Sequence, residues 1–152
     1  MNKWMRIALI VGAVLVAIQM VPVDRTNPPV EGVVAAPQEV YAVLERSCFD
    51  CHSNQTRWPW YSRVAPVSWL VARDVHAARE EMNFTEWNRM DARKQAKKIE
   101  ECWEMVEQGK MPLPYYLPMH REARLSDADK ALIRDWARVA GRGEGGGSDG
   151  DD

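Results

Sequence analysis

The pentapeptide Cys48-Phe49-Asp50-Cys51-His52 is the stretch that decides how this chain is organised. It has the pattern C-x-x-C-H, in which two thiols three positions apart are followed at once by an imidazole. Two such thiols can add across the two vinyl groups of one haem, which brings the histidine beneath the iron. The pattern therefore predicts covalent attachment of one haem c.

Two other kinds of site use closely spaced cysteines, and each requires a further feature. A structural zinc site needs a second pair of ligands, but the only other cysteine, Cys102, has no companion. A dithiol oxidoreductase needs its C-x-x-C at the start of a helix in a βαβ unit, and no pattern of parallel strands is visible. Neither alternative accounts for the histidine as simply as haem attachment does.

The first 23 residues read as a membrane anchor or signal segment. Lys3 and Arg6 precede residues 7–21, which are apolar apart from Gly12 and Gln19. This length lies between a signal-peptide core and the roughly 20 residues of a full membrane span. Because no good small-residue cleavage site follows, we expect a retained single-pass anchor. Secretion to the periplasm after cleavage is the alternative.

The positive charges before the anchor predict how the chain is oriented in the membrane. Positive residues before the anchor favour a cytoplasmic N-terminus, so the rest of the chain faces the other side. In a bacterium this predicts an inner-membrane protein whose haem domain lies in the periplasm, where haem c is attached. The net charge is −2, without a long basic run, which argues against a nucleic-acid partner.

Residues 24–36 contain prolines and little periodicity, so we expect an extended linker. Residues 141–152 are mostly glycine and acidic residues, which predicts a disordered tail. Between them, residues 37–140 form one expected domain of helices at 37–47, 66–82, 91–109 and 126–141. The expected fold class is all-α, a small cytochrome-c-like domain around the haem.

The helical spacing also predicts which side chains are buried. The expected inward residues are Val40, Val43, Leu44 and Ser47 in the first helix, Trp69, Leu70, Val75 and Met82 in the second, Ala92, Ala96, Ile99, Trp103 and Val106 in the third, and Leu132, Ile133, Trp136 and Ala140 in the last. Trp87 is a further expected core residue. Cys102 is expected to be a free, half-buried thiol.

Three stretches together resemble a known family. They are C-x-x-C-H, the segment Trp58-Pro59-Trp60-Tyr61, and the pair Met111-Pro112 before the helix that opens at Leu125-Ser126-Asp127-Ala128-Asp129. The chain looks like a small c-type cytochrome, and it resembles more closely the bacterial membrane-anchored proteins with a haem-binding domain. The resemblance covers about residues 37–140. It implies haem c and says little about a substrate.

The resemblance implies a set of haem ligands. Cys48 and Cys51 would form the thioethers, and His52 would be the proximal ligand. Met111 would be the distal ligand, because a thioether on a proline-stiffened loop can reach the opposite face. His120 is the rival distal ligand and would give bis-histidine coordination. His76, Met119 and an open sixth position are weaker alternatives.

Further residues near the motif are candidates for the haem surroundings. Trp58, Trp60 and Tyr61 can pack on the macrocycle, although they also fit an ordinary aromatic core. Arg57 and Arg63 flank this cluster and can pair with propionates. Arg57 and Arg63 fit equally well as ordinary arginines on the solvent-exposed surface.

These observations predict a membrane-tethered carrier of single electrons that serves a redox partner protein. No catalytic set and no small-molecule substrate are expected. One alternative is a haem-based redox or gas sensor, or a peroxidase-like haem enzyme, with a displaceable sixth ligand. Another is a structural subunit of a respiratory assembly. The sequence leaves the partner, the reduction potential and the oligomeric state open.

Overall fold

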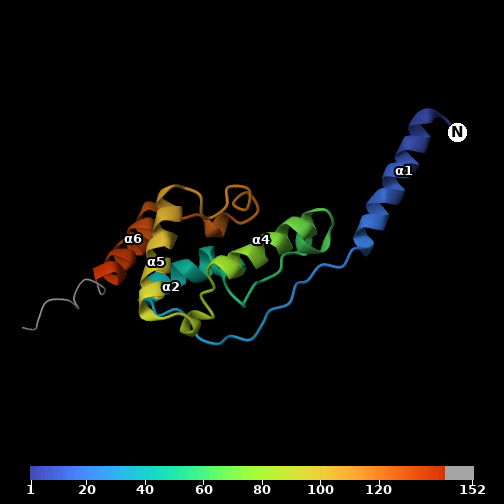
Figure 1. The fold of residues 1–152 in the computed structure, drawn as a ribbon. Coiled ribbons are helices and arrows are strands. Elements are labelled where there is room, and N and C mark those ends of the chain that lie inside the picture. Colours follow the sequence, from blue (N-terminus) through green and yellow to red (C-terminus); the bar gives the residue numbers. More distant parts are fainter. Residues whose placement is uncertain (143–152) are drawn as a thin grey trace, which may run out of the picture.

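The computed structural model describes residues 1–142, and these residues are helical or irregular (Figure 1). Within them no strand forms, apart from one isolated bridge between Gly32 and Glu86. The expected all-α class is confirmed. The expected disordered tail lies outside the described residues from position 143 onward. Its first two residues, Gly141 and Arg142, instead complete the last helix.

Six α-helices form the described chain. They are α1 (Lys3–Ala17), α2 (Gln38–Ser47), α3 (Phe49–His52), α4 (Val67–Glu81), α5 (Ala92–Glu107) and α6 (Asp127–Arg142). Short 3₁₀ segments η1 (Ile18–Met20), η2 (Trp60–Arg63), η3 (Trp87–Arg89) and η4 (Arg121–Ala123) link them. The four expected helices are therefore present as α2, α4, α5 and α6.

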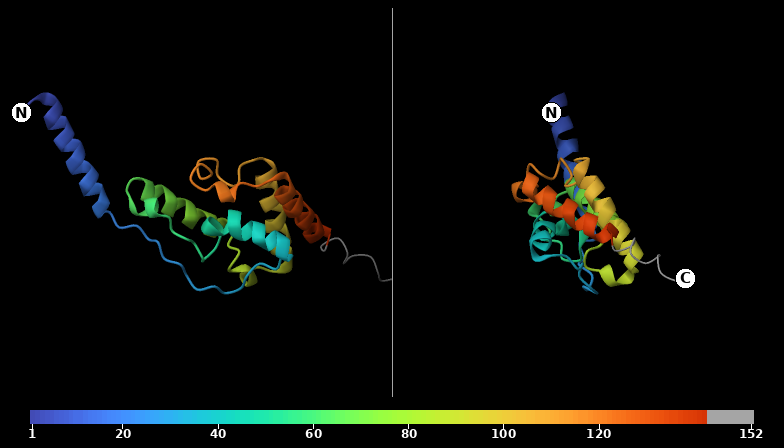
Figure 2. Two further views of the ribbon diagram at one scale, coloured as in Figure 1. Left: turned by 180° about the vertical axis from the view of Figure 1, so that it is seen from behind. Right: turned by 90° about the vertical axis from the view of Figure 1, so that its left-hand side faces the viewer.

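The helices are arranged as a compact body with one projecting arm. Helix α1 extends away from the body, and α5 and α6 pack against each other at the opposite end (Figures 1 and 2). Helix α2 lies between α3 and α6, while α3 also packs on α4. The C-x-x-C-H motif is thus carried at the junction of three helices.

Capping groups fix the ends of the helices. The Asp91 carboxylate accepts the Lys94 N–H at 2.8 Å, which satisfies a free donor at the start of α5. Ser126 and Asp129 exchange hydrogen bonds at the start of α6, in the reciprocal arrangement of a capping box. After α5, Gly109 has a φ of +66°, which ends the helix. All three devices were expected from the sequence.

One apolar core joins α2, α3, α5 and α6. It contains Val40, Val43 and Leu44 of α2, Phe49 of α3, Ile99, Cys102 and Val106 of α5, Ile133, Trp136 and Ala137 of α6, and Phe84 and Trp87 from the α4–α5 loop. Seven of the thirteen inward positions expected for α2, α5 and α6 are among them. The core therefore holds α2, α5 and α6 as one unit.

Some burial predictions were wrong. Trp69 and Leu70 of α4 are 38% and 39% exposed, because α4 turns Ala72 and Val75 inward instead. In α5, Ala92 is exposed at the helix start. Cys102 is buried, not half-buried, because it belongs to the apolar core. An apolar residue on an amphipathic helix thus marks the inner face only approximately.

The linker is extended and contacts the domain along its length. Val34 is buried, and its N–H donates to the Phe84 carbonyl at 2.8 Å. Gly32 passes so close to Asn88 that an added Cβ would lie 2.3 Å from the amide nitrogen. A larger residue at position 32 would therefore require the exposed Asn88 side chain to move aside. This part of the linker therefore shares a surface with the α4–α5 loop.

The first helical segment, Lys3–Met20, has a mean hydropathy of 1.6 over 18 residues, and none of it is buried in the protein. By length and composition it can cross a membrane. A signal sequence at this position would have the same properties.

We expect Ile133→Ala in α6 to destabilise the domain by about 2–5 kcal/mol, because Ile133 is fully buried and its removal leaves a cavity. Val139→Ala on the same helix is the control, since Val139 is 68% exposed, and it should change the free energy of unfolding by less than about 0.5 kcal/mol. Denaturant unfolding followed by circular dichroism measures both. Equal unfolding midpoints for the two variants would contradict this packing.

Candidate cofactor site

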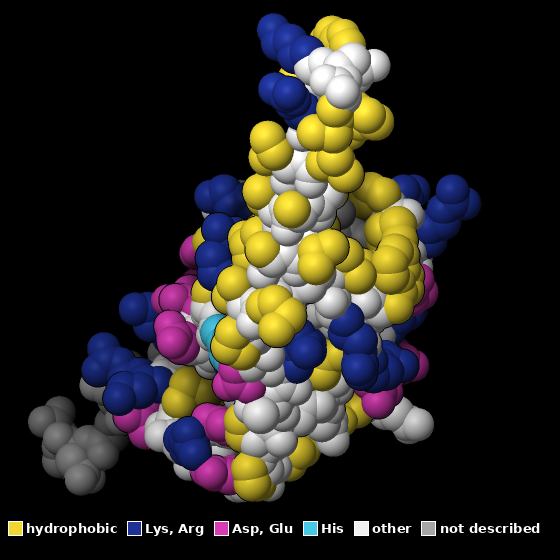
Figure 3. Space-filling model, turned by 90° about the vertical axis from the view of Figure 1, so that its right-hand side faces the viewer, with side chains coloured by type: hydrophobic (Ala, Val, Ile, Leu, Met, Phe, Trp, Pro, Cys, Tyr) yellow, Lys and Arg dark blue, Asp and Glu magenta, His cyan; other side chains and the backbone are white. Residues whose placement is uncertain are grey.

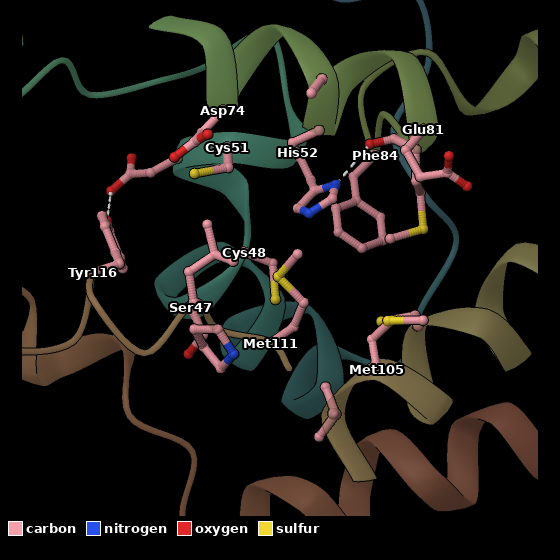
Figure 4. Close-up of a pocket in the computed structure, with 18 of the residues that line it drawn as sticks. Ser47, Cys48, Cys51, His52, Asp74, Glu81, Phe84, Met105, Met111 and Tyr116 are labelled. Carbon is pink, nitrogen blue, oxygen red and sulfur yellow. Dashed lines mark hydrogen bonds between the residues drawn. The ribbon is translucent and has the colours of Figure 1, made fainter. Parts of the chain in front are cut away.

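A cavity of about 720 Å³ opens beside the C-x-x-C-H motif (Figure 4). Its walls come from the end of α2, from α3, α4 and α5, and from the loop that follows α5. The lining is predominantly apolar, with a few charged groups at its edge. A volume of this size lies within the roughly 300–1,000 Å³ typical of sites for small molecules and cofactors.

The motif lines this cavity because α3 is a single tight turn. The Cys51 and His52 N–H groups both donate to the Cys48 carbonyl, at 3.1 and 2.9 Å. Residues three and four apart on such a turn face the same side. Cys48, Cys51 and His52 consequently all border the one cavity.

A hydrogen bond from one ring nitrogen fixes the orientation of His52. Its Nδ1 lies 3.0 Å from the Met82 carbonyl, which can only accept, so Nδ1 carries the hydrogen. Burial keeps the pKa of His52 below its usual range, because the charged ring would lose its hydration. At neutral pH the ring is therefore neutral, and Nε2 retains a lone pair, as a metal ligand must.

The backbone of His52 is held by the loop after α4. The Phe84 N–H donates to the His52 carbonyl at 2.8 Å. Beside it, the Asn54 N–H donates to the Thr85 hydroxyl at 2.7 Å, and the Asn83 amide donates to Asn54 Oδ1 at 2.7 Å. These side chains are buried, and together they form a polar clamp behind the motif.

Arg79 of α4 completes this support from the linker side. Its guanidinium donates to the Ser53 carbonyl at 2.8 Å, to the Thr26 carbonyl at 3.0 Å and to Asn27 Oδ1 at 2.8 Å. Burial lowers the pKa of Arg79 from its usual value. The sequence interpretation missed Arg79 and the polar clamp, because their pairings join segments far apart in the chain.

Both thiols of the motif are protonated at neutral pH. Burial is the main cause that raises the pKa of Cys51 to about 11 and that of Cys48 well above its usual value. Cys102 also borders the cavity, and burial raises its pKa to about 12. Reactive redox dithiols and zinc sites depend on thiolates, so these environments do not favour either use of the free thiols.

Met111 borders the cavity, and in Figure 4 it lies across from His52. Its N–H donates to the Met105 carbonyl at 3.1 Å, which ties the loop to the end of α5. Met82 and Met105 border the same cavity. The sequence interpretation did not consider Met82 and Met105 as candidate ligands, although both lie in predicted helices.

The rival ligand His120 is not among the residues that line this cavity. Its Nε2 lies 2.5 Å from the Tyr61 hydroxyl, and its Nδ1 lies 3.0 Å from a Glu122 carboxylate oxygen. Its ring also stacks on Tyr116, with the ring centroids 3.9 Å apart. His76 likewise lies elsewhere, near the Asp24 carbonyl.

A second hollow of about 390 Å³ adjoins the first and shares Cys51 with it. Arg57, Trp60, Tyr61 and Met119 line this second hollow. Trp58 is turned toward the linker, where its indole donates to Asn27 Oδ1 at 3.2 Å. Arg63 is exposed and lines neither hollow.

Tyrosine–carboxylate pairs lie between the two hollows. The Tyr116 hydroxyl donates to Asp50 at 3.0 Å, and the Tyr115 hydroxyl donates to Asp74 at 2.6 Å. Burial and the nearby carboxylate raise the pKa of Tyr115 to about 12 and raise that of Tyr116 still more. Both hydroxyls are therefore donors at neutral pH.

The donor set of the cavity fits haem. Two neutral thiols, an imidazole with a free Nε2 and a thioether surround an apolar space. Ser47 Oγ, at the cavity wall, is buried, and within the described residues it has no hydrogen-bond partner. Such an atom is expected where a bound group completes the site. Fold and cavity thus define a helical cofactor-binding protein.

Comparison with known proteins identifies the family. The family model of the haem-binding domain matches residues 13–139, which is more than half of the chain and contains the whole cavity lining. The chain belongs to the haem-binding domain family, and it binds haem. No curated protein and no solved structure matches it.

We expect Asn83→Ala to destabilise the protein by about 1–3 kcal/mol, because it leaves buried groups of Asn54 and Thr85 without their partners. Asn88→Ala is the control. Asn88 is exposed and makes one long hydrogen bond of 3.4 Å, so its loss should cost less than about 0.5 kcal/mol. Thermal and denaturant unfolding measure the difference. Unchanged stability of Asn83→Ala would show that the clamp does not hold the motif.

Proposed function

We propose that the chain attaches one haem c covalently and carries single electrons in the bacterial periplasm. The observation that supports this proposal is the shared cavity of Cys48, Cys51, His52 and Met111. Haem bound there supplies a one-electron couple between ferrous and ferric iron. The residues of the chain provide attachment, axial ligands and a surrounding of low polarity.

Cys48 and Cys51 are proposed to make the covalent links. Each S–H adds across one vinyl group, so that a carbon–sulfur bond forms and the hydrogen goes to the neighbouring carbon. The addition involves no net oxidation or reduction. Because both thiols border the cavity from one helical turn, they are suited to reach the same edge of one macrocycle.

His52 is proposed as the proximal ligand and Met111 as the distal ligand. The free Nε2 of His52 and its hydrogen bond to Met82 provide an oriented, neutral ligand. A methionine opposite histidine raises the reduction potential, as in electron-transfer cytochromes. A filled sixth position favours electron transfer over gas sensing or peroxidase-like chemistry. His120 is less suited, since both of its ring nitrogens already have partners outside the cavity.

Helix α1 is proposed to be a retained single-pass anchor with the haem domain on the periplasmic side. Lys3 and Arg6 at its start support a cytoplasmic N-terminus. An anchored carrier needs only a transient surface for a redox partner protein, so no substrate pocket is required.

We expect the protein to gain the mass of one haem when it is made together with a haem c attachment system. Cys48→Ser/Cys51→Ser should lose its haem on extraction with acidified acetone, because no thioether remains. Cys102→Ser is the matched control and should retain it. Intact mass spectrometry gives the answer. Haem that stays with the double variant would disprove covalent attachment.

We expect Met111→Ala to open the sixth position, lower the reduction potential and admit carbon monoxide, while the haem stays attached. The wild type should be low-spin in both oxidation states and bind carbon monoxide poorly. Met105→Ala is the matched control, because Met105 borders the same cavity, and it should keep the wild-type spectrum. Optical spectra and potentiometry measure these changes. An open-site spectrum in His120→Ala, or ready carbon monoxide binding by the wild type, would contradict the assignment.

A further inference from the structure

An exposed apolar surface surrounds the second hollow. Trp60, Val67, Leu70 and Met119 all line this hollow, and each is substantially exposed, with Trp60 at 70%. We call these four residues the interfacial patch. Single exposed apolar residues are common, but several around one hollow, with a large tryptophan among them, indicate a binding surface.

The base of α1 is attached to the loop that carries this patch. The Gln19 side-chain amide donates to the Ala65 carbonyl at 3.2 Å, and Gln19 Oε1 accepts the Ala65 N–H at 2.9 Å. Just beyond, Arg25 donates to the Ser62 carbonyl at 3.2 Å. The chain that leaves α1 is thus joined to residues 62–65, between Trp60 and Val67. In Figure 3, hydrophobic side chains gather around the base of α1, with Lys and Arg side chains beside them.

The position of Gln19 fixes the depth of the patch. The candidate membrane span Lys3–Met20 has 18 residues, which corresponds to about 27 Å of helix. The hydrocarbon core of a bilayer is about 30 Å thick. A spanning α1 therefore brings Gln19, and with it Ala65, to the boundary between hydrocarbon and headgroups.

We propose that the interfacial patch lies on the lipid surface, so that the haem domain is docked on the bilayer and not suspended on its linker. This inference rests on the proposed function of α1 as a membrane anchor. Trp60 suits the headgroup boundary, since tryptophan combines a large apolar ring with a polar N–H. Arg57 lines the same hollow and Arg63 is exposed nearby in sequence, where both can meet lipid phosphates.

A lipid surface is favoured over a protein partner because the patch is continuous with the anchor. Any occupant of the patch must fit beside the emerging α1, where the bilayer itself lies. The docking directs the side of the haem cavity that carries Cys51 and Tyr116 toward the membrane, since both residues border the two hollows. The α5–α6 end is then directed away from it (Figure 1).

The test uses full-length, haem-loaded ferric protein with 5-fluorotryptophan, reconstituted in nanodiscs of phosphatidylcholine and phosphatidylglycerol. Fluorine signals are assigned with single Trp→Phe variants. Adding a phosphatidylcholine spin-labelled near the headgroup broadens signals close to the lipid surface, relative to the same discs without the label. We expect loss of the Trp4 signal in the anchor and of the Trp60 signal, while the Trp103 and Trp136 signals of α5 and α6 persist.

Trp4 separates the two proposals. Loss of the Trp4 signal with a persistent Trp60 signal would overturn the docking and leave the anchor in place. Persistence of both signals would overturn both proposals. Loss of the Trp103 and Trp136 signals together with that of Trp60 would overturn the docking as well, because the domain would then have no fixed orientation.

A pair of variants tests the patch itself while keeping Trp60 as the reporter. Val67→Gln/Leu70→Gln should restore much of the Trp60 signal and leave the loss at Trp4 unchanged. Val33→Gln/Val139→Gln replaces exposed apolar residues elsewhere and should behave as the wild type. The substituted positions are exposed, and circular dichroism together with the optical spectrum of the haem verifies the fold. A Trp60 signal that stays lost in Val67→Gln/Leu70→Gln would overturn a role for the patch.

Discussion

The hydrogen bond from His52 Nδ1 to the Met82 carbonyl is the constraint on which the site depends. It fixes the tautomer of the ring and leaves a lone pair on Nε2. The bond requires the end of α4 to stay beside α3. The link from the Phe84 N–H to the His52 carbonyl, the buried Asn54–Asn83–Thr85 contacts and the Arg79 guanidinium all serve that placement. Buried polar groups of this kind are costly unless they are paired, so the arrangement tolerates little movement.

The apolar core and the cofactor cavity share walls. Phe49 and Phe84 belong to the core, and Phe84, Cys102 and Val106 also border the cavity. A group bound in the cavity would therefore contact the same packing that holds α2, α5 and α6 together. Because a ligand that binds only the folded chain stabilises it, haem held in this cavity, as proposed, would stabilise the folded domain. The linker belongs to the same packing, since Val34 is buried and its N–H donates to the Phe84 carbonyl.

The second hollow connects the cofactor cavity to one exposed side of the domain. Its residues join the cofactor cavity on one side and an exposed apolar surface on the other. The Gln19–Ala65 pair connects that surface to α1. In the proposed docking, this short polar contact at the base of the apolar helix relates the orientation of the cofactor cavity to the plane of the membrane. This relation follows from two hydrogen bonds between residues 46 positions apart.

The sequence alone determined the all-α class, the helix caps at Asp91, Ser126 and Gly109, and the family, because each depends on local spacing or on a short motif. C-x-x-C-H predicted that Cys48, Cys51 and His52 border one site, since the three residues lie within one helical turn. Tertiary structure decided the features that depend on residues far apart in the sequence. Residues of the α4–α5 loop support His52, three methionines border one cavity, and His120 lies outside that cavity. Tertiary structure also turned Trp69 and Leu70 outward, because a helix with apolar residues on several sides buries only the side that meets a neighbour.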